Sequence, residues 1–134
     1  MKRKSVTVLT LCGLFVINSI PIFAASNQQI SLPKNQAWMT AGSETRTGNF
    51  SYARAGCDAV YPETGNDNFS KIQVRLKNSN GSVISKESYT VLTEGNGTEK
   101  IYLKEGYMNT SSVTFQFRGN SSSSAKAIVD YNGL

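Results

Sequence analysis

The stretch KIQVRLK, residues 71–77, is the clearest sign of how this chain folds. Its apolar and polar side chains alternate, so that a strand here would bury one face and leave the other in water. Asn80-Gly81 follows, and both residues tolerate the positive φ of a tight hairpin. We therefore expect residues 71–77 to pair with a strand within 82–92.

The same alternation recurs in residues 98–104, 112–118 and 125–131. Residues 94–97, Glu-Gly-Asn-Gly, predict a second hairpin before residues 98–104, and the serine-rich residues 119–124 predict a polar loop. The residues expected to point inward are Ile72, Val74, Leu76, Ile101, Leu103, Val113, Phe115, Phe117, Ala127, Val129 and Tyr131.

Residues 49–61 have an unusual face of small side chains. An opposing layer could approach this face closely and bury the thiol. In a regular strand the face would consist of Ser51, Ala53, Ala55, Cys57 and Ala59. A bulge at Gly56 would reverse the two faces beyond it. Cys57 is therefore expected to be buried, with a disulfide between two chains as the alternative.

Many short strands separated by turns predict an all-β fold. We expect a small antiparallel two-layer β-sandwich of seven or eight strands, with jelly-roll or immunoglobulin-like topology. A small closed barrel is the alternative, and the order of the strands is left open by the sequence.

Residues 1–25 have the parts of a secretory signal peptide. A basic start, Lys2-Arg3-Lys4, precedes an apolar run that ends at Ala24-Ala25. The expected division is a cleaved signal peptide, 1–25, and one β-sandwich domain, 26–134. We expect a secreted, extracellular protein, and the leader and composition are typical of a Gram-positive bacterium.

The charge of the chain lies partly in this leader. The whole sequence has 14 basic and nine acidic residues, but without Lys2, Arg3 and Lys4 the basic residues number 11, leaving a net charge of +2. Recognition of nucleic acid needs a more concentrated basic surface. Nucleic acid is therefore not an expected partner.

Catalytic and metal-binding residues are scarce. The sequence has no histidine, and Cys57 is the one cysteine after the leader, which excludes the usual nucleophilic triads and zinc sites. Carboxylate pairs such as Glu63 and Asp67, or Glu94 and Glu99, are more typical of solvated loops than of a glycosidase. We expect no enzymatic activity, no cofactor and no metal; the oxygen-rich loop 64–68 is expected to be an ordinary turn.

Outward-facing cations and tyrosines are the candidate ligand contacts. If their strands share one sheet, they would form a basic, aromatic footprint able to hold an anionic polymer and stack on a sugar ring. The alternative is an ordinary solvated sheet surface. The candidate binding residues are Tyr52, Arg54, Arg75, Lys100, Tyr102 and Arg118 on strands, with Tyr61 and Tyr107 in loops.

Trp38 is the only tryptophan in the sequence. Large aromatic side chains dominate core burial, so we expect it between the sheets. A surface position would instead allow it to stack on a sugar or anchor a partner.

These features favour a secreted, non-enzymatic binding module. The expected partners are an extracellular glycan, an anionic wall polymer or a protein. The first alternative is an antimicrobial or membrane-active, toxin-like β protein, which the outward lysines make less favoured. A proteinase inhibitor, presenting loop 62–68 or 105–110, is the second. The oligomeric state does not follow from the sequence.

Overall fold

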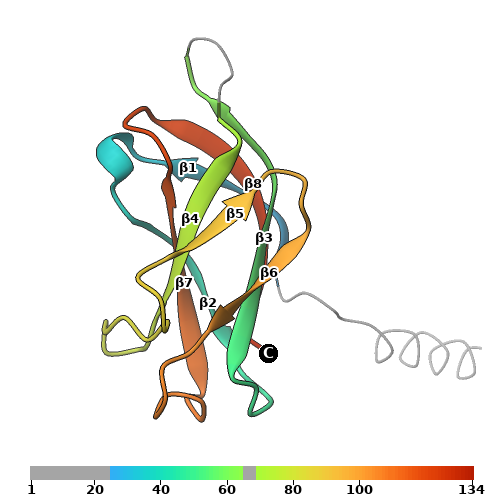
Figure 1. The fold of residues 1–134 in the computed structure, drawn as a ribbon, viewed down its shortest axis with the longest axis vertical. Helices are drawn as coiled ribbons and strands as arrows, with labels where there is room; N and C mark the ends of the chain where they lie inside the picture. Colours follow the sequence, from blue (N-terminus) through green and yellow to red (C-terminus); the bar gives the residue numbers. More distant parts are fainter. Residues whose placement is uncertain (1–24, 65–68) are drawn as a thin grey trace, which may run out of the picture.

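The computed structural model describes residues 25–64 and 69–134, which form two packed antiparallel sheets (Figure 1). The expected signal peptide lies outside the described residues except for Ala25. Sheet A has the order β1 (Ala25–Leu32), β8 (Ala125–Asn132), β3 (Tyr52–Pro62) and β6 (Thr98–Tyr102). Sheet B has the order β2 (Met39–Thr45), β7 (Ser112–Gly119), β4 (Lys71–Lys77) and β5 (Thr90–Thr93).

A short 3₁₀ turn, η1 (Lys34–Gln36), joins β1 to β2. In the described part of the chain, no helix has the length and apolar character needed to cross a membrane.

The expected all-β, two-layer sandwich is confirmed, and its strand order is that of a jelly roll. Within the described residues, every connection except that from β4 to β5 crosses from one sheet to the other. The β4–β5 pairing confirms the hairpin expected after residues 71–77, and Lys77 also bridges to Val83.

The second expected hairpin, at residues 94–97, is wrong. A turn does form there, with the Asn96 amide donating to the Thr93 carbonyl at 3.1 Å. However, β5 pairs with β4 in sheet B, whereas β6 pairs with β3 in sheet A. The turn therefore carries the chain between layers, because turn residues set a local reversal and not the pairing partner of the next strand.

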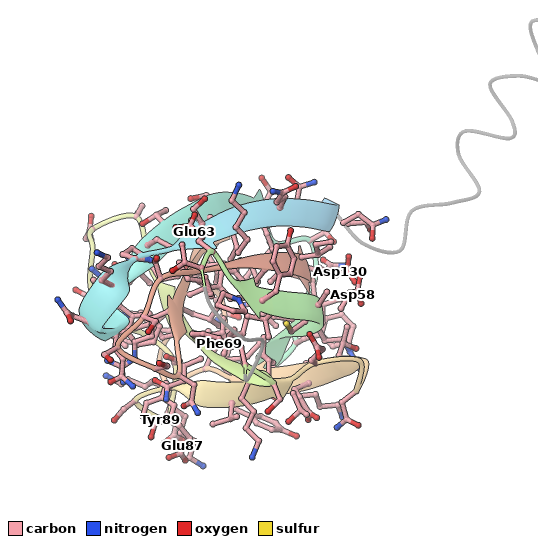
Figure 2. All side chains as sticks on the ribbon, turned by 90° about the horizontal axis from the view of Figure 1, so that it is seen from above. Asp58, Glu63, Phe69, Glu87, Tyr89 and Asp130 are labelled. Carbon is pink, nitrogen blue, oxygen red and sulfur yellow. The ribbon has the colours of Figure 1, made fainter. Side chains whose placement is uncertain are left out.

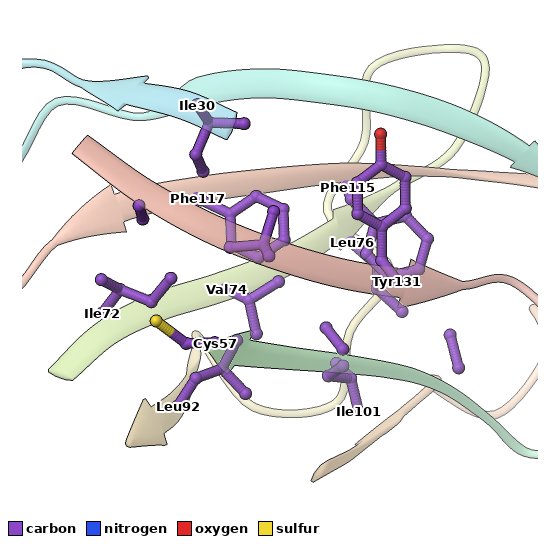
Figure 3. Close-up of a cluster of buried hydrophobic side chains, with 14 of the residues drawn as sticks. Ile30, Cys57, Ile72, Val74, Leu76, Leu92, Ile101, Phe115, Phe117 and Tyr131 are labelled. Atoms are coloured by element: carbon purple, nitrogen blue, oxygen red, sulfur yellow. The ribbon is translucent and has the colours of Figure 1, made fainter. Parts of the chain in front are cut away.

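The core lies between the sheets, and Figure 3 shows its central side chains. All of the residues predicted to point inward are buried. Phe115 and Phe117 from sheet B pack on Tyr131 from sheet A, with ring centroids 4.7 and 6.0 Å from the tyrosine ring. The aromatic rings of β7 thus join the two layers.

Strand β3 supplies the expected small side chains, but its bulge is at Asp58, two residues after Gly56. The register with β8 shifts between Cys57 and Ala59, so that Asp58 is the extra residue. Ala53, Ala55 and Cys57 are buried before the bulge, and Val60 is buried after it. The expected burial of Cys57 is confirmed, and its thiol is free.

A buried arginine fastens the C-terminal end of the chain to two loops. Arg46 donates from Nε to the Gly133 carbonyl at 2.9 Å, from Nη1 to the Met108 carbonyl at 2.8 Å, and from Nη2 to the Phe50 carbonyl. Its side chain is 7% exposed, and burial lowers its pKa. Arg46 therefore fixes the loop that carries Phe50.

Candidate functional site

The candidate binding residues do not share one face. Tyr52 and Arg54 on β3, with Lys100 and Tyr102 on β6, belong to sheet A. Arg75 on β4 and Arg118 on β7 belong to sheet B. The expectation of a single footprint is wrong, because alternation within each strand identifies outward residues but not the sheet to which they belong.

The outer face of sheet B carries a cluster that we call the arginine–tryptophan platform: Trp38, Arg75, Tyr89 and Arg118. The guanidinium carbons of Arg75 and Arg118 lie 4.2 and 4.5 Å from the centroid of the Trp38 ring. Arg118 also lies over Tyr89, at 5.3 Å. One indole therefore contacts two cations.

Trp38 is half-buried on this surface, so the expectation that it fills the core is wrong. Its position immediately before β2 explains the difference. Met39 pairs with Phe117 on β7, which brings the preceding residue beside Arg118 on the outer face.

Two glutamines hold the arginines in place. Gln73 stands opposite Arg118 and Gln116 stands opposite Arg75 across the β4–β7 ladder. The Nε groups of Arg118 and Arg75 donate to these glutamine carbonyls at 2.5 and 2.8 Å. Because a guanidinium has five N–H donors, this contact uses one donor of each arginine while fixing its direction.

The glutamines are fixed in turn by their own amide groups. Gln116 donates to the Thr40 hydroxyl at 3.0 Å, and Gln73 donates to the Asn120 side chain at 2.9 Å. Gln73 is only 6% exposed although it lies on the outer face. The platform is thus a preorganised network across β2, β7 and β4.

Repulsion between the two cations remains in the folded state. Burial lowers the pKa of Arg75, and the neighbouring Arg118 charge lowers it further. An anion bound between them would relieve this repulsion. The electrostatics of the platform therefore favour a negatively charged ligand.

A cavity of about 290 Å³ adjoins the platform at Arg75. Three cations line it, Arg75, Lys86 and Lys104, against one carboxylate, Glu87. Lys104 Nζ donates to the Val83 carbonyl at 3.0 Å, which holds its ammonium at the rim. In Figure 2, Glu87 and Tyr89 project from the same side of the sandwich. The cavity and the platform thus form one continuous basic surface.

The outer face of sheet A carries a second cluster, the tyrosine ladder, defined by Phe50, Tyr52 and Tyr102. The Tyr52 ring centroid lies 5.7 Å from that of Phe50 and 5.8 Å from that of Tyr102. Lys100 and Arg54 lie over Tyr52, at 4.6 and 5.5 Å from its centroid. The structure thus joins four of the predicted residues in this smaller cluster.

The two remaining candidates stand apart from both clusters. Tyr61 is 37% exposed, but it lies in β3 and not in a loop. Tyr107 is half-buried and packs against the hydrophobic core, so its expected exposure is wrong. Its side chain turns toward the core, since an aromatic side chain gains more from burial than from water.

Several acidic residues lie outside the arginine–tryptophan platform and the tyrosine ladder. Asp58 and Asp130 lie side by side (Figure 2), and burial together with the charge and hydrogen bond of Asp130 raises the pKa of Asp58. The Glu94 carboxylate accepts from the Val60 amide at 2.7 Å, just beyond the bulge. Asp67 and most of loop 64–68 lie outside the described residues. In residues 25–64 and 69–134, no three potential ligand side chains are grouped to hold a metal.

Cys57 is expected to be chemically inert in the folded protein. Burial, with the nearby charges of Glu94 and Asp58, raises its pKa to about 12 from 9.0. A thiol reagent at pH 8 should label the native protein at least a hundredfold more slowly than the denatured chain, because the thiolate is the nucleophile. Equal rates would contradict this burial.

Because of this raised pKa, the free energy of unfolding depends on pH in the alkaline range. Between about pH 9 and 12 the unfolded chain loses the Cys57 proton and the folded chain keeps it. The contribution of Cys57 to the free energy of unfolding is therefore complete below pH 9 and is lost as the pH rises through that window.

The sequence did not identify Tyr89, Gln73 and Gln116 as parts of the site. Tyr89 lies in the irregular segment before β5, where no periodicity indicates direction. The two glutamines occupy outward positions, but their cross-strand partners follow only from the β4–β7 register.

No protein-family model matches the chain, and no curated protein matches it. A comparison with solved structures finds a glycoside hydrolase family 43 arabinoxylan arabinofuranohydrolase from Bacillus subtilis, in complex with cellotetraose. The sequences are 17% identical, the TM-score is 0.42, and the match covers 79% of this chain and 21% of that one. The chain thus spans about a fifth of that structure, and so loose a likeness assigns neither an activity nor a ligand.

Proposed function

We propose that this protein is a secreted, non-enzymatic module that binds an anionic polysaccharide through the arginine–tryptophan platform of sheet B. The observation that carries the proposal is the pair of guanidiniums, Arg75 and Arg118, over the single indole of Trp38. A basic cavity continues the same surface.

The chemistry of the platform suits a charged sugar chain. Arginine binds carboxylate and phosphate groups through paired N–H donors. The apolar faces of sugar rings pack on aromatic side chains whose polar edges remain in water. Because the glutamine network already fixes both arginines, little side-chain entropy is lost on binding. An acidic polysaccharide uses the cations and the aromatic rings together.

A retention assay on immobilised polygalacturonate tests the proposal. The Arg75→Ala/Arg118→Ala variant should bind at least about tenfold more weakly than wild type, equivalent to about 1.4 kcal/mol. Wild-type retention should also fall at about 1 M salt, where the screening length is only about 3 Å. Neutral dextran should retain neither protein.

The matched control is Lys34→Ala/Lys126→Ala, which removes the same charge from outside both clusters. It should bind nearly as well as wild type. If the control and the platform variant lose retention equally, the protein binds by net charge alone and the proposed site is wrong. Release of dye from anionic vesicles by wild type would support the membrane-active alternative instead.

A further inference from the structure

We infer that the tyrosine ladder of sheet A is a second sugar-binding surface, so that one molecule bridges two polysaccharide chains. This inference rests on the proposed function, because it concerns the same class of ligand. It adds a second site of different chemistry, dominated by exposed aromatic rings and not by paired arginines.

Exposure of the ladder is its first unusual feature. Phe50 and Tyr102 are each 48% exposed, and they flank Tyr52. Tyr52 itself is half-buried between them. The two exposed rings thus offer apolar ring faces on which a sugar can stack.

The ladder is also held in place by the fold. Arg46 donates a hydrogen bond to the Phe50 carbonyl and thereby anchors its loop. The Phe50 ring lies directly over Gly48, where an added Cβ would approach ring carbons to 2.8 Å. Tyr52 and Tyr102 are direct cross-strand partners on β3 and β6. The fold therefore sets the backbone positions from which the three rings project.

Charge limits how a ligand lies on this face. Arg54 and Lys100 stand beside the ladder as cross-strand partners. Asp130 on β8 pairs with Gly56, farther along β3 than Arg54, and Asp58 lies beside it. A polyanion running along β3 would meet these carboxylates, whereas one running across β3 and β6 would lie over Arg54 and Lys100. The geometry thus favours a chain that crosses the strands over Tyr52 and Tyr102.

The two surfaces face in opposite directions. They lie on the outer sides of two sheets that pack about 10 Å apart, and the core fills the space between them. A sugar chain stacked on the ladder would have to turn around the edge of the sandwich to reach the platform. Occupation of both surfaces by separate chains therefore joins those chains.

A bridging assay tests this inference. Polygalacturonate beads are loaded with protein, washed, and then offered fluorescent soluble polygalacturonate. Wild type should capture the soluble polymer on the beads. Phe50→Ala/Tyr102→Ala should still bind the beads through sheet B but capture at least tenfold less soluble polymer. Both side chains are exposed, so this variant should unfold at nearly the wild-type temperature.

A polymer without rings gives the second arm of the experiment. Poly(glycerol phosphate) offers negative charge to the platform but no sugar ring to the ladder. It should be retained on protein-loaded beads far less than polygalacturonate, and beads made from it should bind protein through the platform alone. Equal bridging of the two polymers would overturn the role of the aromatic rings.

The two proposals fail in different ways. If wild type binds the beads but captures no soluble polymer, or if the ladder variant captures as much as wild type, the second surface is wrong and the platform stands. If Arg75→Ala/Arg118→Ala binds the beads as well as its control does, the platform is wrong. Sedimentation of the protein alone shows whether it forms a dimer. If bridging depends on that dimer and does not depend on the tyrosine ladder, the inference is also wrong.

Discussion

Replacing Arg46 by alanine should lower the free energy of unfolding by about 3–5 kcal/mol, because several buried acceptors lose their donor at once. The guanidinium is the donor to three backbone carbonyls, of Phe50, Met108 and Gly133. Alanine would leave a cavity and deprive these acceptors of their partner, and an unsatisfied buried acceptor costs about 1–3 kcal/mol. Chemical denaturation monitored by tryptophan fluorescence measures the loss.

Two comparisons make this prediction specific. Arg54→Ala removes an arginine that is not buried and that contacts Thr98 at 3.4 Å, so its cost should stay below about 1 kcal/mol. Arg46→Lys keeps the charge but lacks the branched set of donors, and it should recover only part of the loss. A change below about 1 kcal/mol for Arg46→Ala would show that water replaces the guanidinium.

Replacing Phe115 by alanine should cost about 3–5 kcal/mol, the usual range for a buried phenylalanine. The ring is fully buried and packs 4.7 Å from Tyr131 of the opposite sheet. Its removal would open a cavity at the point where the two layers meet (Figure 3). Chemical denaturation provides the free energy, and an unchanged slope would show that the unfolded state is the same.

Phe50→Ala is the matched control, because it makes the same chemical change at a side chain that is 48% exposed. Its cost should be below about 1 kcal/mol, since surface substitutions usually change stability little. If both variants lose the same stability, the core does not depend on Phe115 in the way that its burial indicates.

The fold class follows from the sequence because alternation and burial have the same period of two. Residues 71–77 and 112–118 each place every second side chain in the core, as β4 and β7 do. The jelly-roll order of the strands could not be predicted from the sequence, because it depends on pairings between distant segments. The connection at 94–97 illustrates this, since the same turn residues serve both a hairpin and a crossing between layers.

The candidate site was predicted in its residue types but not in its arrangement. The sequence indicates that Arg75 and Arg118 point outward, and they do. It does not indicate that Gln73 and Gln116 bind them, since those contacts depend on the β4–β7 register. Trp38 shows the opposite error: its size favours burial, but its place beside Arg118 keeps it on the surface.

The central position of β8 in sheet A has a kinetic consequence. The strand built from residues 125–132 hydrogen-bonds to β1 on one side and β3 on the other, so β1 acquires its sheet partner only from the far end of the chain. Contacts this distant in sequence are slow to form. Sheet A therefore cannot be completed in a nascent chain until residues 125–132 have been synthesised.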